Sequence, residues 1–319
     1  MSECRIAVMD DWQRVAQGAV DWNALASVGQ VEFLHEYPSD LETMVQRLAP
    51  YSVLCVMRER TPLHAELLER LPRLKLIVTG GMRNAAIDLA AAQARGILVC
   101  GSPSYRQAAP ELTWALLMAL SRNLVNEANS VRNGGWQLGL GQDLCGRTLG
   151  LLGLGNIGGT VAGYAKAFGM DVIAWSENLT DARAEAVGVR KVERKALFEQ
   201  ADILSIHLVL SERTRHLVDS QALAWMKRGA LLINTSRGPI VDEHALLAAL
   251  ESGRLGGAAL DVFDQEPLPP DHPLRHLPSV LATPHLGYVT ENNYRTFYSA
   301  MIEDILAWHG GQPIRVLAP

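Results

Sequence analysis

The sequence predicts an α/β protein of two domains, each built on a parallel β-sheet. The chain has 319 residues, about twice the length of a domain of about 150 residues. Hydrophobic residues make up 48% of it and aromatic residues only 6%, which favours small helices packed on strands over an aromatic-rich β-sandwich. Short apolar runs alternate with helical stretches, and this alternation is typical of parallel sheets with helical crossovers.

The first hundred residues contain four apolar runs that predict buried strands. Between them, helical periodicity predicts helices over 40–48 and 63–71, and Pro62 is well placed to begin the second. The strands are expected at 5–9, 52–57, 74–79 and 97–100.

One long helix is expected from Pro110 to about Arg132. It is apolar over more than one face, so it is buried between domains or subunits, or else within one domain. Glycines at 134 and 135 end it. A second series of alternating strands and helices follows over 148–284, and a last helix is expected over 291–308.

Charge and cysteine content disfavour several classes of function. Lys+Arg 29 against Asp+Glu 34 gives a net charge of −5 without a basic cluster, so no nucleic-acid partner is expected. Cys4, Cys55, Cys100 and Cys145 lie far apart without zinc-site spacing, so no metal site is expected and a reducing cytoplasm is favoured. With neither a signal-peptide pattern nor an apolar run of membrane-spanning length, no membrane partner is expected.

The clearest single motif is a glycine-rich turn between an expected strand at 148–152 and a small-residue helix at 160–168. The first glycine permits a tight turn, the second lets the backbone approach a pyrophosphate, and the third lets the helix pack closely on the strand. The helix N-terminus offers unpaired N–H groups to the phosphates. The motif predicts a Rossmann domain that binds a dinucleotide through Gly153, Gly155, Asn156, Ile157 and Gly158.

The next expected strand, 170–175, ends where an acidic residue usually binds the adenosine ribose. Ser176 occupies that position and Glu177 follows it, with no Arg or Lys immediately after. Because Glu177 would repel a 2′-phosphate, NAD is expected and NADP is disfavoured.

Three further segments begin near the ends of expected strands in the second series. Ligands of open α/β sheets bind at the carboxyl ends of the strands, so the three segments are expected to converge on one crevice. They span 231–239, 258–267 and 280–288, and they contain Arg237, Asp261, Glu266 and His285.

In combination, these motifs resemble the D-isomer-specific 2-hydroxyacid dehydrogenases, which include phosphoglycerate, glycerate and hydroxypyruvate enzymes. The likeness covers nearly the whole chain, in the glycine turn, 201–207, 234–238, 260–267 and 283–285. It implies two Rossmann-like domains: an NAD-binding domain over 103–286, and a flavodoxin-like substrate domain that is discontinuous, over 1–102 and 287–319.

The resemblance implies hydride transfer between nicotinamide and a small D-2-hydroxy acid or 2-keto acid, with 3-phosphoglycerate as the named candidate. His285 is implied as the acid/base, because histidine titrates nearest to neutral pH. Glu266 is implied as its partner. Arg237 is implied as the substrate anchor, since its planar guanidinium suits a carboxylate. Direct hydride transfer needs no metal.

The resemblance also places residues at the cofactor. Asp261 is expected at the nicotinamide amide, with structural bonding at the strand end as the alternative. His207 is expected to border the cofactor, although Leu208–Leu210 stands where relatives place a proline. Thr235 and Ser236 are further expected cofactor contacts.

Substrate recognition is expected partly from the first domain. Relatives have a Gly-x-Gly-x-Asp turn after the third expected strand, whose N–H groups bind the substrate carboxylate; here Arg83 replaces the second glycine and Ala85 the acid. Arg58 and Arg83 provide a second anionic site for a phosphate or carboxylate, or they are solvated loop arginines. The expected substrate contacts are Arg58, Gly80, Gly81, Met82, Arg83, Arg237 and Tyr288.

A second class of function stays open: an NAD(H)-binding, corepressor-like or sensing protein of the same fold. Such relatives keep the Arg, Glu and His, so the motifs alone do not separate it from an enzyme. A homodimer is expected through the Rossmann domain, because the helix that begins at Pro110 is apolar on several faces.

Overall fold

The computed structural model describes residues 4–36 and 40–319, which divide into two units. Unit 1 holds the described residues up to Tyr105 together with Tyr288–Pro319, and unit 2 holds Arg106–Gly287. The sequence placed the boundaries at 102 and 286. Tyr105 belongs to unit 1 because its backbone N–H donates a 2.7 Å hydrogen bond to Asn293 Oδ1 on helix α12 (Glu291–His309).

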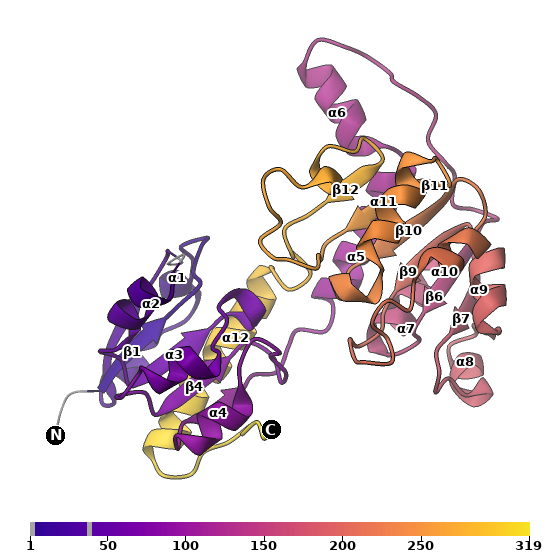
Figure 1. Cartoon of the computed structure of the whole chain (residues 1–319). Helices are drawn as coiled ribbons and strands as arrows, with labels where there is room; N and C mark the ends of the chain where they lie inside the picture. Colours follow the sequence, from indigo (N-terminus) through magenta and orange to yellow (C-terminus); the bar gives the residue numbers. More distant parts are fainter. Residues whose placement is uncertain (1–3, 37–39) are drawn as a thin grey trace. The chain divides into compact units, whose positions relative to one another are not determined.

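A five-stranded parallel sheet forms the centre of unit 1, in the order β2-β1-β3-β4-β5 (Figure 1). The strands are β1 (Cys4–Val8), β2 (Gly29–Phe33), β3 (Val53–Val56), β4 (Leu76–Thr79) and β5 (Leu98–Gly101). The other helices are α1 (Ala16–Ala19), α2 (Leu41–Leu48), α3 (Ala65–Glu69) and α4 (Leu89–Ala94), with 3₁₀ turns at Trp22–Leu25 and Arg58–Arg60.

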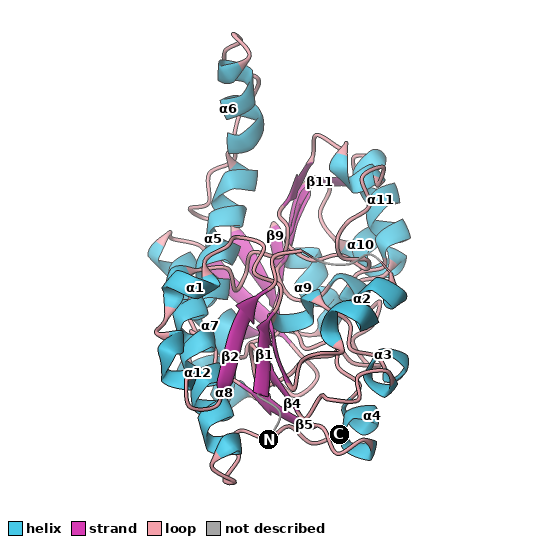
Figure 2. Ribbon diagram, turned by 90° about the vertical axis from the view of Figure 1, so that its left-hand side faces the viewer, coloured by secondary structure: helices cyan, strands magenta, loops and turns pink. Residues whose placement is uncertain are grey.

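Alternate residues of the unit 1 strands pack on opposite faces of the sheet. In β3, Val53 and Cys55 belong to the cluster that includes α1 and α12, while Leu54 and Val56 pack with α2, α3 and α4. Figure 2 shows helices on both sides of the strands. Because both faces are covered, the central strands β3 and β4 are buried throughout, and the last helix of the chain completes the core of its first hundred residues.

Unit 2 has a seven-stranded sheet, also fully parallel, in the order β12-β11-β10-β9-β6-β7-β8. Successive strands are added toward one edge of the sheet from β6 to β8 and toward the other edge from β9 to β12. Open α/β sheets bind ligands at the point where this order switches, which here lies between β6 and β9. The strands are β6 (Thr148–Leu152), β7 (Asp171–Trp175), β8 (Arg190–Lys191), β9 (Ile203–Ile206), β10 (Ala230–Asn234), β11 (Leu255–Leu260) and β12 (Val280–Ala282). The helices are α5 (Ala108–Ser121), α6 (Leu124–Arg132), α7 (Asn156–Ala167), α8 (Asp181–Ala186), α9 (Arg194–Gln200), α10 (Ser220–Trp225) and α11 (Glu243–Glu251), with 3₁₀ turns at Gly238–Ile240 and Pro273–Arg275.

These two sheets confirm the predicted fold class. The expected single helix over 110–132 is wrong, because the chain breaks at Asn123, which has a left-handed φ of 50°. Asparagine tolerates this conformation better than most residues, so α5 ends at Ser121 and a separate helix, α6, begins at Leu124. Figures 1 and 2 both show α6 projecting from unit 2. Strand β2 was not expected, and α3 is shorter than the predicted helix over 63–71.

Within the described ranges, no helix combines the length and the apolar composition that crossing a membrane requires.

Candidate active site

The glycine turn of unit 2 connects β6 to α7 and is shaped to leave room for a ligand. Gly153 has a φ of 108°, and a Cβ there would lie 2.5 Å from the carbonyl oxygen of His207. A Cβ on Gly158 would lie 2.3 Å from the carbonyl oxygen of Gly153, so only glycine lets α7 pack this closely. A Cβ on Gly155 would meet nothing within 4 Å. The turn therefore fits a dinucleotide, with its open side at Gly155, Asn156 and Ile157, where α7 begins.

The expected ribose-binding residues directly follow β7, beside the glycine turn. The Gly153 N–H donates to the carbonyl of Trp175, the last residue of β7, over 2.9 Å. Ser176 is half-buried and Glu177 is exposed. A guanidinium that the sequence did not single out also lies here, because Arg183 Nε on α8 donates a 3.4 Å bond to the Leu154 carbonyl.

The segment after β10 is tied into unit 2 by its polar side chains. Ser236 Oγ donates to the Ile206 carbonyl at 2.9 Å, and the Thr235 hydroxyl lies 2.7 Å from that of Thr113 on α5. Arg237 Nη1 donates to the Ser236 carbonyl at 2.7 Å. The backbone that carries Arg237 is thereby fixed at the carboxyl end of β10.

Glu266 and His285 form a hydrogen-bonded pair in unit 2. His285 Nδ1 lies 2.6 Å from Glu266 Oε2, and Glu266 Oε1 accepts a 2.9 Å bond from the Phe263 N–H. With both carboxylate oxygens bonded, the orientation of Glu266 is set, and it holds one ring nitrogen of His285. The His285 and Glu266 side chains are 19% and 33% exposed, so the pair is accessible to a substrate. His285 has a left-handed φ of 54°.

Asp261, at the end of β11, bonds the segment that carries His285. Its Oδ1 accepts from Thr283 Oγ1 at 2.6 Å and from the Leu286 N–H at 2.7 Å, and its Oδ2 accepts from the Gly287 N–H at 2.8 Å. Burial raises the pKa of Asp261, and these three hydrogen bonds oppose that shift. They correspond to the alternative role, structural bonding at the strand end, while its contact with a cofactor stays a prediction.

His207 follows β9 and packs beside the glycine turn. Its Nε2 lies 2.9 Å from the hydroxyl of Ser205, and burial lowers the pKa of His207 to about 4. It is therefore neutral at physiological pH and suited to packing, not to proton transfer.

In unit 1, Arg58 lies over the loop after β4. Its Nη1 is 3.3 Å from the Gly80 carbonyl, and its Nε is 3.4 Å from Glu59 Oε2. A Cβ on Gly81 would lie 1.8 Å from Arg58 Nη1 and would displace that guanidinium, and the φ of 91° at Gly81 independently favours glycine. The carbonyl of Arg58, whose φ is a left-handed 56°, accepts a 2.6 Å bond from Asn84 Nδ2. Buried Asn84 therefore holds Arg58 in place, a role that its sequence position did not indicate.

The same loop offers backbone donors. The Gly81 N–H donates a 3.0 Å hydrogen bond to Ser102 Oγ. The N–H groups of Met82 and Arg83 donate to no acceptor in the part of the chain that the structure describes, and both residues are exposed. The available donors thus lie one and two residues after Gly81.

Tyr288, the first residue of unit 1 after the His285 segment, bonds an arginine that the sequence did not single out. Arg60 Nε donates to Tyr288 Oη at 2.8 Å. Arg60 and Tyr288 are 228 positions apart in the chain, so no local pattern could have connected them.

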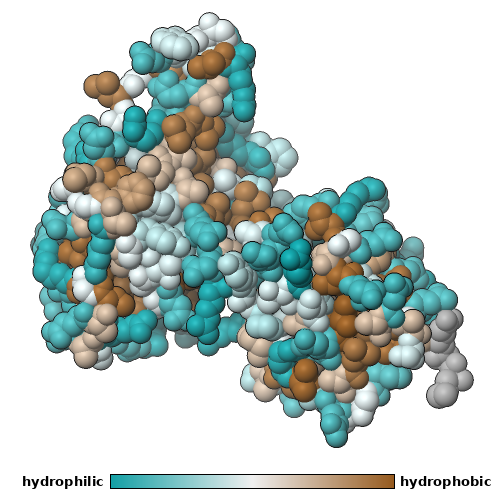
Figure 3. Space-filling model, turned by 180° about the vertical axis from the view of Figure 1, so that it is seen from behind, coloured by the Kyte–Doolittle hydropathy of each residue, from teal (hydrophilic) through white to brown (hydrophobic). Residues whose placement is uncertain are grey.

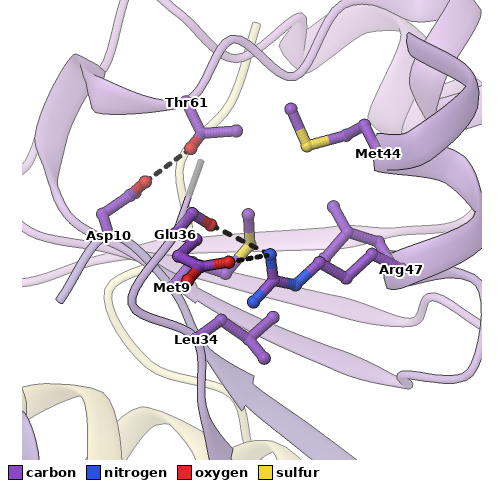
Figure 4. A pocket seen from close by; sticks show the side chains of 8 residues that line it. Met9, Asp10, Leu34, Glu36, Met44, Arg47 and Thr61 are labelled. Atoms are coloured by element: carbon purple, nitrogen blue, oxygen red, sulfur yellow. Dashed lines mark hydrogen bonds and ion pairs between the residues drawn. The ribbon is translucent and has the colours of Figure 1, made fainter. Parts of the chain in front are cut away.

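A narrow cavity elsewhere in unit 1 carries its own internal bonds (Figure 4). Thr61 Oγ1 donates to Asp10 Oδ1 at 2.5 Å, and Arg47 Nη1 donates to the Glu36 carbonyl at 3.3 Å. The Met57 N–H also donates to Asp10 Oδ2, at 3.1 Å. Its polar groups therefore stabilise one another, which is typical of a structural cavity.

Across residues 4–36 and 40–319, no group of three His, Cys, Asp or Glu side chains is arranged to hold a metal ion.

The family model of the D-isomer specific 2-hydroxyacid dehydrogenase NAD binding domain matches residues 114–287. A glyoxylate reductase from Korarchaeum cryptofilum is 35% identical over 284 residues, which cover 87% of this chain and 85% of that protein. A D-3-phosphoglycerate dehydrogenase from Methanocaldococcus jannaschii is 36% identical, but only 54% of its length is matched. The crystal structure of a phosphoglycerate oxidoreductase from Vibrio cholerae superposes with a TM-score of 0.92 at 36% identity, covering 97% of this chain and 99% of that one.

Proposed function

The chain belongs to the D-isomer-specific 2-hydroxyacid dehydrogenase family, and from this premise we propose how its residues divide the reaction. It is an NAD-dependent D-2-hydroxyacid dehydrogenase. We propose that it converts a small 2-keto acid and the corresponding D-2-hydroxy acid into each other, with His285 as acid/base and Arg237 as substrate anchor. The observation that carries this proposal is the 2.6 Å contact between Glu266 and His285.

The Glu266–His285 pair supplies the proton. Glu266 engages Nδ1, so Nε2 is the ring nitrogen that serves the substrate oxygen. In reduction, Nε2–H donates to the forming alkoxide, and the Glu266 carboxylate stabilises the imidazolium beforehand. In oxidation, neutral Nε2 accepts the hydroxyl proton. The bound cofactor would supply the hydride as NADH in reduction and accept it as NAD⁺ in oxidation.

Arg237 binds the substrate carboxylate and polarises the neighbouring keto oxygen in this proposal. A planar guanidinium presents paired donors to a carboxylate, and the bond from Nη1 to the Ser236 carbonyl limits its freedom. The N–H groups of Met82 and Arg83 are proposed as further donors to the substrate.

The proposed cofactor contacts are made by three groups of residues. The glycine turn binds the pyrophosphate, with the α7 N-terminus facing the phosphates. Ser176 and Glu177 bind the adenosine ribose. The remaining proposed contacts come from the ends of β9, β10 and β11, at His207, Thr235, Ser236 and Asp261.

We propose glyoxylate and hydroxypyruvate as the first substrates to test. Relatives named glyoxylate reductase and glycerate dehydrogenase are matched over 85% and 95% of their lengths. The relatives named D-3-phosphoglycerate dehydrogenase are matched over about half of theirs. For 3-phosphoglycerate, the second anionic group would fall to Arg58 and Arg83.

A cytoplasmic homodimer is the proposed form of the protein. All four cysteines are free thiols, which suits a reducing compartment. The α6 segment exposes Leu124, Val131, Trp136, Leu138 and Leu140, and Figure 3 shows apolar atoms near the end of unit 2 that carries α6. Such a surface is typical of a protein interface.

The test is turnover of NADH with glyoxylate, hydroxypyruvate and 3-phosphohydroxypyruvate, followed by absorbance. At least one acid should be reduced, and His285→Ala should lose at least about 100-fold in kcat with an unchanged NADH dissociation constant. NADH binding without turnover of any 2-keto acid would instead favour the sensing alternative. Undiminished turnover in His285→Ala would remove His285 from the proton-transfer step.

A further inference from the structure

Arg60 joins three segments of unit 1. Beyond its bond to Tyr288 Oη, its Nη2 donates to Tyr294 Oη on α12 at 2.9 Å, and its Nη1 donates to the Asp10 carbonyl after β1 at 2.6 Å. The guanidinium carbon also lies 4.4 Å from the ring centre of Trp12. The loop after β1, the turn after β3 and the start of α12 are thus held by one side chain.

The groups that accept hydrogen bonds from the Arg60 guanidinium are all neutral. Arg60 Nη1 also lies 3.3 Å from Gln13 Oε1, so two phenols, a carbonyl and an amide surround it. The nearby Asp10 carboxylate is bonded to Thr61 and to the Met57 N–H. A guanidinium with five N–H donors in a fixed fork is suited to such a multi-point tie. Arg60 therefore has little donor capacity left for a substrate anion.

The ring of Tyr288 connects Arg60 to Arg58. The guanidinium carbon of Arg60 lies 5.4 Å from the centre of the Tyr288 ring, and that of Arg58 lies 5.9 Å from it. Both distances are within the range of a cation–π contact. Arg58 in turn lies against Gly80 and Gly81, at the loop whose next two N–H groups are available.

We propose that Arg60 is a positioning residue for substrate recognition. It fixes Tyr288, and the Tyr288 ring holds the Arg58 guanidinium at the 80–83 loop, so that Arg58 and not Arg60 meets the substrate. The inference rests on the proposed function, in which N–H groups of this loop bind the 2-keto acid, and it adds the Arg58 side chain as a substrate contact, as the sequence predicts. Because it concerns unit 1 alone, NADH binding by the glycine turn should be independent of Arg60.

The test compares Arg60→Met, Arg60→Lys, Tyr288→Phe and the double variant Arg60→Met/Tyr288→Phe. Arg60→Met should raise the KM for the 2-keto acid about tenfold or more, because a displaced Arg58 guanidinium would bind the substrate less well. The change in kcat should be smaller, and the NADH dissociation constant should be unchanged. Arg60→Lys should not rescue the KM, since a single ammonium cannot replace the fork. The matched control is Arg70→Met, whose arginine pairs with Glu42 on the surface, and it should match the wild type.

The double variant separates positioning from direct contact. If Arg60 acts through Tyr288, the KM of the double variant should equal that of Arg60→Met alone. A KM raised by the product of the two single-variant effects would show that Arg60 contacts the substrate independently and would overturn the proposal. An unchanged KM in Arg60→Met would overturn it as well. Should Arg60→Met not fold, Tyr288→Phe keeps the ring and removes only the phenol, and an unchanged KM there would refute the role of the bond.

Binding of oxamate, a non-reacting analogue of a 2-keto acid, separates this inference from the proposed function. Calorimetry on the NADH complex measures it without turnover. Weaker oxamate binding in Arg60→Met than in Arg70→Met supports the positioning role even if no keto acid is reduced. Equal binding in the two variants argues against that role whether or not the enzyme turns over.

Discussion

Glu266 binds the Phe263 N–H with one carboxylate oxygen and His285 Nδ1 with the other, and the variant Glu266→Gln disrupts this arrangement. Glutamine has a single acceptor oxygen, so it cannot accept from both groups, and its neutral amide no longer stabilises an imidazolium. We expect kcat for keto-acid reduction to fall at least about tenfold, with an unchanged NADH dissociation constant. Steady-state kinetics and fluorescence titration measure both, and Glu251→Gln on the exposed side of α11 is the control. A wild-type kcat would contradict the role of the carboxylate.

Asp304 on α12 makes the stability of unit 1 depend on pH. Burial raises the pKa of Asp304 from 3.8 to about 6, although Arg315 Nε bonds its Oδ1 at 2.9 Å and opposes the shift. Between these two values the folded protein binds more protons than the unfolded chain, so its free energy of unfolding decreases as pH rises. The contribution of Asp304 is fully present below pH 3.8 and is lost as pH rises through about 6.

The variant Asp304→Asn should flatten this dependence. Urea unfolding at intervals across the pH range between the two pKa values measures the slope of the free energy of unfolding against pH. This slope should be more negative in the wild type than in Asp304→Asn by about 1 kcal/mol per pH unit. The control is Glu303→Gln, because Glu303 is an exposed residue that also pairs with Arg315, and this variant should keep the wild-type slope. Equal slopes in the wild type and Asp304→Asn would show that another group titrates.

At the level of elements, two glycines of the β6–α7 turn and one inside α7 should respond differently to alanine. Gly155→Ala adds a Cβ to open space, so the protein should fold normally while NADH affinity falls at least about tenfold. Gly158→Ala places a Cβ against the Gly153 carbonyl, so it should lower the free energy of unfolding as well. Gly163→Ala, inside α7 with no neighbour within 4 Å, should instead stabilise the protein by about 0.5–1 kcal/mol.

Thermal unfolding and NADH titration of the three variants check these expectations together. Unchanged NADH affinity in Gly155→Ala would place the pyrophosphate elsewhere.

Elements with strong local patterns were predictable from the sequence. The glycine turn, the buried strands of both sheets and α12 follow from apolar runs, periodicity and turn residues. The break at Asn123 was missed because Leu117, Leu120 and Leu124 continue the helical spacing of apolar residues across it. Strand β2 was missed because it is an edge strand whose residues are only partly buried.

The candidate site was predictable only as far as its motifs reach. Glu266, His285 and Asp261 lie in short segments at strand ends, so their convergence follows from a parallel sheet. The arrangement of Arg60 and Tyr288 depends on tertiary packing between distant segments, and that of Asn84 on a bond to Arg58 across 26 positions. Neither leaves a signal in local sequence.

At the scale of the whole molecule, the α6 segment predicts self-association. Leu138 and Leu140 are 61% and 101% exposed on the loop that follows α6, which is unfavourable for a surface left in water. The wild type should elute at about twice the mass of one chain in light-scattering chromatography, and the double variant Leu138→Asp/Leu140→Asp should shift toward the monomer.

The matched control for this shift is Leu306→Asp, on α12 of unit 1, which is 39% exposed and should keep the dimer. A monomeric wild type at micromolar concentration would contradict the prediction.

The left-handed backbone at Arg58 and His285 lowers the stability of the fold in order to hold side chains that are proposed to serve activity. Glycine would adopt these φ values of 56° and 54° at about 1 kcal/mol lower cost, but it would remove the side chains proposed to bind substrate and to move the proton. A library screened only for heat resistance should therefore accumulate glycine or asparagine at these two positions and lose turnover. Engineering for heat resistance should begin instead at positions such as Gly163, where stabilisation leaves the proposed catalytic side chains in place.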